Sequence, residues 1–184
     1  MSEPVPFEAF DKIPRLRRGC VITEKIDGTN AQVYIPEDDG PMLIDSRNRW
    51  ITPADDNYGF ARWATENEAA LRLLGPGRHF GEWWGAGIQR RYGVAEKRFS
   101  LFNTTRWKDG LPCNLPNVAT TPVLYEGEFS DTAVADCLAG LRDVGSVAAP
   151  GFMQPEGIVV FHVASRSLYK VTLGGDGHKE ARGK

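Results

Sequence analysis

Hydrophobic residues along this chain fall mostly in short runs that predict β-strands. The runs are rich in β-branched and aromatic residues and are bounded by residues that favour turns. They occupy residues 20–23, 31–35, 42–46, 79–84, 98–102, 123–125, 157–163 and 167–173. The run at 157–163 is almost wholly apolar, as in a strand buried on both faces, whereas 167–173 alternates strictly. Strands are therefore expected to dominate the fold.

Two segments show helical spacing instead. Apolar positions between residues 60 and 74 recur at helical intervals, and Asp55 or Asp56 can cap the start of that helix. A second helix is expected to begin after Ser130 or Asp131, because short polar side chains there can accept a hydrogen bond from the first turn. The pattern thus predicts a mixed α and β fold.

The chain carries no internal repeat and no linker that would mark a second domain. With 184 residues, of which 41% are hydrophobic, it is long enough to bury one substantial core. A single domain over residues 1–184 is therefore expected. Residues 173–184 are rich in glycine and charge, which predicts a flexible tail.

The charge balance limits the kind of partner. A net charge of −2 excludes the overall basicity of a protein that coats nucleic acid. Arginines do occur in local clusters, which suit either phosphate contacts or a solvated surface. These clusters are Arg15, Arg17 and Arg18, then Arg47 and Arg49, then Arg90 and Arg91.

Cysteine usage and the absence of long apolar runs indicate a cytoplasmic protein without membrane segments. The three cysteines, Cys20, Cys113 and Cys137, are widely spaced and form no CxxC pair, so they are expected to be reduced and structural. The first residues have neither a basic nor an apolar targeting segment, and no run approaches the length of a membrane span.

The residues with the clearest chemistry lie at 24–30, Glu-Lys-Ile-Asp-Gly-Thr-Asn. Lys25 and Asp27 are two apart in an extended run, so their side chains share one face. A lysine can attack phosphorus as the free amine, and a neighbouring carboxylate can hold a metal ion. Lys-x-Asp-Gly alone also suits a surface lysine before a turn.

Four later segments make the pattern specific. They read Phe-Gly-Glu-Trp-Trp-Gly-Ala-Gly-Ile-Gln at 80–89, Phe-Ser-Leu-Phe-Asn at 99–103, Glu-Gly-Ile-Val-Val at 156–160 and Leu-Tyr-Lys-Val at 168–171. In this order, they resemble the motifs of the covalent nucleotidyltransferase superfamily of polynucleotide ligases and mRNA-capping enzymes. The segment at 80–89 resembles specifically the RNA ligase 2 family of phage-type RNA-repair enzymes. The resemblance spans residues 19–173.

The resemblance implies a fold and a reaction. The fold is α+β, with two mainly antiparallel sheets, flanking helices and an AMP pocket between the sheets. The reaction is ATP-dependent RNA ligation, in which AMP passes from ATP to a lysine, then to an RNA 5′-phosphate, and is released when a 3′-hydroxyl attacks. The cofactors implied are ATP and Mg²⁺ or Mn²⁺, and the partners are RNA ends.

The resemblance also implies roles for the motif residues at the reacting phosphate. Lys25 is the nucleophile that forms the lysyl-AMP intermediate. Asp27 and Glu156 are the carboxylates expected to hold the divalent ion, directly or through its waters. Lys170 is expected to grip the α-phosphate. Many relatives carry a second lysine two residues after this one, where this chain has Thr172, so one positive charge is missing unless Lys179 or an arginine supplies it.

A second group of motif residues is expected to hold the nucleoside. Glu82 would bind a ribose hydroxyl, and Phe102 would stack on adenine, although ordinary core packing also suits Phe102. Arg47, with Asn30 nearby, would contact phosphate or ribose, a role that Arg49 could also take. Backbone and edge contacts around Glu24 would distinguish adenine from guanine.

Other functions remain open on the sequence alone. A DNA ligase or a GTP-dependent capping-type enzyme would share the pocket, and a nucleotide-binding or RNA-end-binding relative that does not seal is a further alternative. Relatives usually carry a C-terminal domain that helps to hold RNA, and only a short segment follows residue 173 here. A separate RNA-binding partner is therefore a possible replacement.

Overall fold

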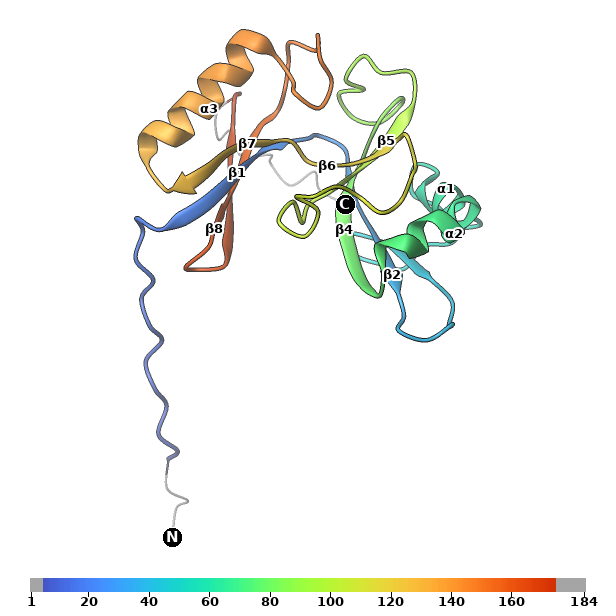
Figure 1. The fold of residues 1–184 in the computed structure, drawn as a ribbon, viewed down its shortest axis with the longest axis horizontal. Coiled ribbons are helices and arrows are strands. Elements are labelled where there is room, and N and C mark those ends of the chain that lie inside the picture. Colours follow the sequence, from blue (N-terminus) through green and yellow to red (C-terminus); the bar gives the residue numbers. More distant parts are fainter. Residues whose placement is uncertain (1–4, 175–184) are drawn as a thin grey trace, which may run out of the picture.

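The strands form two sheets that lie next to each other (Figure 1). The computed structural model describes residues 5–174. The smaller sheet has the order β7-β1-β8-β9 and the larger one β3-β2-β4-β5-β6, and all pairings except β5 with β6 are antiparallel. The strands are β1 (Gly19–Lys25), β2 (Thr29–Ile35), β3 (Leu43–Ser46), β4 (Gly77–Gly85), β5 (Lys97–Leu101), β6 (Val118–Thr120), β7 (Val123–Glu128), β8 (Gly157–His162) and β9 (Ser167–Thr172). The expected α+β fold with two mainly antiparallel sheets is confirmed.

The helices cover one face of each sheet, and their apolar sides build two cores. Helix α3 (Asp131–Val144) packs Ala133 and Leu141 against the smaller sheet. Phe60 and Leu71, from α1 (Phe60–Glu66) and α2 (Glu68–Leu71), pack on the larger sheet. The opposite faces of the two sheets are left for the site described below.

The helix expected over residues 60–74 is broken into three pieces. α1 ends before Asn67, whose backbone N–H and side-chain amide both donate to the carbonyl of Trp63, at 3.1 and 2.8 Å. α2 and a 3-10 turn, η1 (Arg72–Leu74), complete the segment. Asp56 does cap the start, because its carboxylate accepts from the backbone N–H groups of Ala61 and Arg62. Ser130 caps α3 as expected.

The strands expected at 20–23 and 31–35 follow each other along the chain but do not pair as a hairpin. β1 lies between β7 and β8 in the smaller sheet, whereas β2 lies between β3 and β4 in the larger one. Residues 26–28 therefore carry the chain from one sheet to the other. Gly28 passes so close to β4 that an added Cβ would lie 2.4 Å from the carbonyl oxygen of Trp83, which only glycine permits.

Three strand expectations need correction. β6 was not anticipated, because three residues carry no periodic signal. β8 is buried along its helix side, whereas on the other face burial falls from Gly157 through Val159 to Phe161, which is 36% exposed. β9 does not alternate in burial: Leu168 and Tyr169 are both exposed, because β9 is an edge strand.

The remaining expectations concern termini, cysteines and membranes. Residues 5–15 have neither helix nor strand and extend away from the sheets (Figure 1). All three cysteines are free thiols, and burial raises the pKa of each. No helix within residues 5–174 is long and apolar enough to cross a membrane. The expected tail falls almost entirely outside the described residues, as does Lys179.

Candidate active site

Lys25 lies at the end of β1 and forms an ion pair with Glu156. Its Nζ is 2.5 Å from Oε2 of Glu156, and the two side chains are 23% and 9% exposed. The pairing of β1 with β8 sets this contact, because Lys25 lies opposite Gly157 and Glu156 immediately precedes that strand. A lysine and a carboxylate that are 131 residues apart in sequence thus meet in a mostly enclosed position.

The register places two rows of residues on the face of Lys25. Lys25, Gly157 and Thr172 form one row across three strands. The next row consists of Thr23, Val159 and Lys170. Because directly opposed residues of antiparallel strands point to the same side, Lys170 shares the face of Lys25. Thr172 lies in the row of Lys25 itself, so the position at which relatives are expected to carry a second lysine is next to Lys25.

Gly157 allows the edge strand to approach β8 closely. Its φ is +153°, and an added Cβ would lie 2.1 Å from the carbonyl oxygen of Val171. Any side chain at this position would push β9 away from β8. Gly157 therefore helps to bring the face that bears Lys170 next to Lys25.

Asp27 is fixed by a loop between β4 and β5. Arg90 Nε is 3.0 Å from Oδ2 of Asp27, and the same guanidinium donates to the carbonyl of Gln154 at 3.0 Å. The backbone N–H of Asp27 donates to the hydroxyl of Tyr92 at 2.8 Å. Tyr92 is itself packed against Trp84 and Phe152. This loop holds the segment between the sheets in place from outside.

Glu82, in the middle of the larger sheet, reaches the segment that follows Lys25. Its carboxylate accepts from the backbone N–H of Gly28 at 3.0 Å and from the side chain of Asn30 at 3.4 Å. Burial raises the pKa of Glu82 to about 7, opposed by the Gly28 hydrogen bond and the charge of Lys25, while the charges of Glu156 and Asp27 raise it further. These charges act on Glu82 because all four groups lie around one site.

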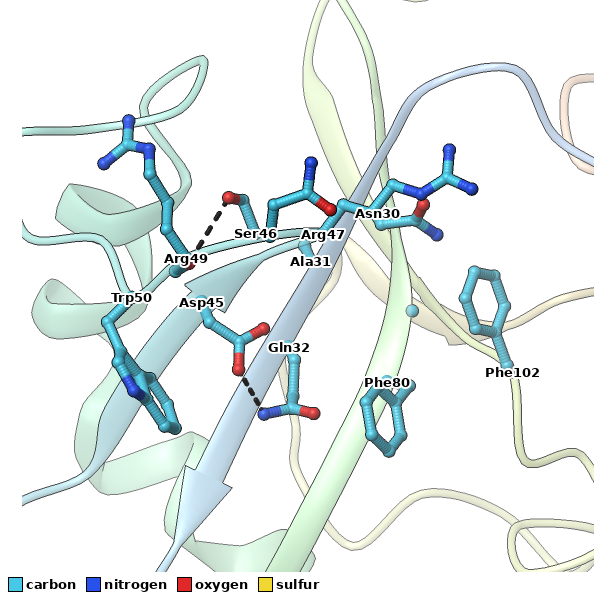
Figure 2. Close-up of a pocket in the computed structure, with 12 residues that line it drawn as sticks. Asn30, Ala31, Gln32, Asp45, Ser46, Arg47, Arg49, Trp50, Phe80 and Phe102 are labelled. Carbon is cyan, nitrogen blue, oxygen red and sulfur yellow. Dashed lines mark hydrogen bonds between the residues drawn. The ribbon is translucent and has the colours of Figure 1, made fainter.

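A cavity of about 490 Å³ continues from Asn30 over the open face of the larger sheet. Figure 2 shows Asn30, Arg47 and Phe102 together at one end of it. The structure therefore brings together the residues expected to hold the nucleoside. Asn30 connects them to Glu82 by its hydrogen bond, and Glu82 in turn lies near the charge of Lys25. Arg49 also lines the cavity, but it is paired with Asp55.

The side chain of Glu24 does not belong to this group. Its carboxylate is buried on the other face of β1, where it accepts from the hydroxyl of Ser146 at 2.5 Å and from the backbone N–H groups of Val147 and Ala148 at 2.8 and 2.9 Å. It thus anchors the segment that leads from α3 towards Glu156. The side chain is thus engaged in the fold, and the backbone N–H of Glu24 donates to the carbonyl of Pro122 at 3.0 Å.

The carboxylates suit a divalent ion that brings most of its own ligands. Residues 5–174 contain no cluster of three or more metal-binding side chains, and Asp27 and Glu156 are each paired with a cation. Mg²⁺ prefers oxygen ligands, keeps several waters and is commonly bound by one or two carboxylates plus phosphate oxygens. Two carboxylates beside a nucleotide therefore fit such an ion, whereas they would not form a closed structural site.

Sequence reasoning missed three residues of the site. Arg90 was noted only as part of a surface cluster, although its position after the Gly-Ile-Gln segment is a usable signal. Tyr92 gave no signal, because a contact to Asp27 across 65 residues depends on the fold. Val159 could have been found, since strand alternation from Gly157 places it on the face of Lys25.

Comparison with known proteins gives one family match and several similar structures. A protein-family profile described as RNA ligase matches residues 18–172. A search of curated protein sequences found no match. Among solved structures, variants of Naegleria gruberi RNA ligase are similar, each at 21% identity. A lysine-to-alanine variant with ATP and Mn has a TM-score of 0.59. A glutamate-to-alanine variant with AMP and Mn has a TM-score of 0.62, and another with ATP and Mn has a TM-score of 0.63. These similarities cover 85% of this chain and 50% of the other, so the chain spans about half the length of that ligase.

Proposed function

Because this chain belongs to the RNA ligase family, we propose that it is an ATP-dependent RNA ligase domain with Lys25 as its nucleophile. The observation that carries the proposal is the position of Lys25: its amine contacts Glu156 at the point where Asp27 and Glu82 also converge. A lysine in this setting can meet a phosphate that cationic groups hold. A surface turn lysine would lack these neighbours.

The first step forms a bond between Nζ of Lys25 and the α-phosphorus of ATP and breaks the bond to pyrophosphate. Lys25 must first lose a proton to water, and Glu156, whose Oε2 lies 2.5 Å from Nζ, holds the amine in place for attack. Lys170 offsets negative charge that builds on the α-phosphate, since it lies on the same face one row away. The product is lysyl-AMP.

The two later steps use the same phosphate position. An oxygen of an RNA 5′-phosphate attacks the AMP phosphorus, which returns the amine of Lys25 and leaves AMP joined to the RNA by a pyrophosphate bond. A 3′-hydroxyl then attacks the RNA phosphorus and expels AMP, which yields a phosphodiester. Each step is an in-line displacement, for which positioning and charge supply most of the catalysis.

The roles of the remaining residues follow from their places. Glu82 and Asn30 would hold the ribose, because they hydrogen-bond to each other at the edge of the cavity. Phe102, 43% exposed on the cavity wall, would stack on adenine. Arg47 would contact phosphate. Asp27 and Glu156 would hold a divalent ion, which when bound offsets charge on the phosphate oxygens.

The similar ligase supports these assignments by its pattern of substitutions. The lysine and the aspartate replaced in its variants stand two residues apart, as Lys25 and Asp27 do. The glutamate replaced in another variant lies as far beyond that lysine as Glu82 lies beyond Lys25. Two further replaced positions, a glutamate and a lysine, have the separation of Glu156 from Lys170.

Sealing makes demands that self-adenylylation does not. Lysyl-AMP formation needs only the pocket, whereas joining must also hold a polyanionic RNA with its ends aligned. The net charge of −2 indicates modest RNA affinity that falls with salt. We propose that the protein acts on RNA ends in the cytoplasm and that another segment or a separate RNA-binding partner aids the sealing step.

The test is labelling with α-labelled ATP and Mg²⁺, followed by denaturing electrophoresis. The wild-type protein is expected to acquire an acid-labile label. Lys25→Ala is expected to acquire none, although its midpoint of thermal unfolding should equal that of the wild type. Lys108→Ala, which removes an exposed lysine from a turn, should label normally. Undiminished labelling of Lys25→Ala would overturn the assignment of the nucleophile.

The same assay distinguishes the nucleotide. ATP is expected to label the protein far better than GTP, because the family is one of RNA ligases rather than capping enzymes. Stacking on Phe102 does not discriminate between purines, so edge contacts must do so. Equal labelling by GTP would favour a capping-type nucleotidyltransferase.

A further inference from the structure

The cavity extends beyond the residues that would hold AMP, and its far half has a different composition. Gln32 and Phe80 lie opposite each other on β2 and β4, one row further from the nucleophile than Asn30 and Glu82. Asp45, on β3, lies opposite Gln32 and forms a 2.5 Å hydrogen bond with it. Trp50 follows, bridged to Asp45 through the backbone. We call these four residues the Trp50 groove.

Two large aromatic rings of this groove are exposed. Trp50 is 49% exposed and Phe80 is 54% exposed, although both belong to the wall of a cavity. Figure 2 shows the rings on either side of the Asp45–Gln32 pair, with Phe102 beyond Phe80. Exposed rings that gather in one hollow mark a binding surface more often than rings scattered singly.

The ring of Trp50 is held in its exposed position. The guanidinium of Arg78 lies 5.6 Å from the Trp50 ring and 5.1 Å from the ring of Tyr34. Its ion pair with Asp45 is long, at 3.9 Å, and half of the side chain is exposed. Arg78 therefore fixes the aromatic surface and still presents a positive charge beside the groove.

The ligand that fits this arrangement is an unpaired nucleotide. A base offers a flat face for stacking on Trp50 or Phe80, and Arg78 and Arg47 are near enough to the cavity for contacts with the phosphates on either side. A base within a duplex is already stacked on both faces and would not enter. The groove is continuous with Asn30, Arg47 and Phe102, so its occupant would be next to the adenylate.

We propose that the Trp50 groove binds an unpaired nucleotide at the end of the RNA strand that is being joined. This inference rests on the proposed function for the identity of the strand, and it adds a site that the AMP pocket does not require. Self-adenylylation needs no RNA, so it should not depend on Trp50 or Arg78. RNA binding should depend on both.

The first test compares RNA binding with labelling by ATP. A short 5′-phosphorylated single-stranded RNA with a fluorescent 3′ label is titrated with each variant, and fluorescence anisotropy reports binding. Trp50→Ala is expected to bind about 5- to 100-fold more weakly, the range typical of losing one base–aromatic stack. Arg78→Met should also bind more weakly, and its loss should shrink as salt is raised.

Matched controls separate these effects from the loss of an exposed side chain elsewhere on the protein. Thermal melts separate them from unfolding. Phe10→Ala removes a fully exposed ring far from the groove, and Arg142→Met removes an exposed arginine from α3, so both should bind RNA like the wild type. If Trp50→Ala unfolds, Trp50→His keeps an aromatic ring and should restore part of the binding.

A second probe reports stacking directly. An RNA with 2-aminopurine near its 5′ end loses fluorescence when that base stacks on an aromatic side chain. Quenching by the wild type and by Phe10→Ala, but not by Trp50→Ala, is the expected result. Quenching that persists in Trp50→Ala, or RNA binding equal to wild type in that variant, would overturn the proposal.

Two other outcomes have distinct meanings. If Trp50→Ala is folded but takes no label from ATP, the groove belongs to the ATP pocket and the inference is wrong. Tighter binding of fully paired RNA than of single strands would also contradict it. If the wild type takes no label but Trp50→Ala still weakens RNA binding, the proposed ligase function is wrong, whereas the RNA-binding role of the Trp50 groove is supported.

Discussion

Arg90 and Asp27 form an ion pair, with 3.0 Å between Nε and Oδ2, that joins the loop after β4 to the segment next to Lys25. This pair occupies a carboxylate that we propose as a metal ligand. Arg90→Met should therefore bind Mn²⁺ about two- to five-fold more tightly, the effect expected for removal of a partly exposed competing ion pair. Electron paramagnetic resonance of free Mn²⁺ measures this without ATP.

Arg91→Met is the matched control for this variant, because it removes the neighbouring arginine, which makes no ion pair within residues 5–174. Its Mn²⁺ affinity should equal that of the wild type. An unchanged affinity in Arg90→Met would show that Asp27 does not contribute to the metal site.

Thr172 lies in one row with Gly157 and Lys25, so that a second lysine at this position would be next to Lys25, the nucleophile that we propose. Thr172→Lys should speed self-adenylylation by about ten-fold, because it adds a positive charge where negative charge builds on the α-phosphate. Rapid-quench labelling measures the rate. Thr172→Met has a similar length without the charge and should give no increase, and a Thr172→Lys rate equal to that of Thr172→Met would contradict the prediction.

Glu82 should make the stability of the protein depend on pH. Burial raises its pKa in the folded protein from 4.5 to about 7, so the folded state keeps a proton that the unfolded state has lost. The stability from this group is full below about pH 4.5 and is lost as the pH rises through about 7, by at most about 3 kcal/mol. Urea unfolding at pH 5 and pH 8 measures the change.

Glu82→Gln cannot titrate, so it should lose less free energy of unfolding than the wild type between those two pH values. The comparison between the two proteins removes the contributions of all other titrating groups. An identical pH dependence in both would mean that Glu82 is ionised across this range, in spite of its burial.

Glu24 is expected to matter for stability rather than for nucleotide contact. Its carboxylate accepts three hydrogen bonds in a buried position. Glu24→Gln turns an amide N–H towards backbone donors and should destabilise the fold by about 2 kcal/mol or more. Urea unfolding tests this. Glu128→Gln, an exposed substitution at the end of β7, should change stability little. Equal stability of Glu24→Gln and wild type would contradict the prediction.

The sequence was informative where chemistry depends on neighbours along the chain. Lys25 could be placed on one face of a strand because alternation is local, whereas Asp27 lies beyond the end of β1. Ser130 was found as a cap for the same reason. The motif order then connected Lys25 to Glu156 and Glu82 by resemblance, and the structure brings those three side chains together.

The sequence was uninformative about features that depend on contacts between distant parts of the chain. Nothing local indicates that β1 and β2 enter different sheets, because the pairing of each strand depends on partners far along the chain. The contact of Arg90 with Asp27 and the exposed position of Trp50 depend on tertiary packing in the same way. The break at Asn67 was missed because apolar spacing continues across it.

The passage of residues 26–28 from one sheet to the other makes the site a junction between two layers. Lys25 and Lys170 belong to one layer, and Glu82 and Phe102 to the other. A nucleotide held by these residues, as proposed above, would cross-link the two layers, and its departure would remove the cross-link. Nucleotide binding would therefore restrict the motion of one sheet relative to the other, at a cost in conformational entropy. A substitution that stiffens residues 26–28 would reduce this cost, and so would raise nucleotide affinity without any new contact to the nucleotide.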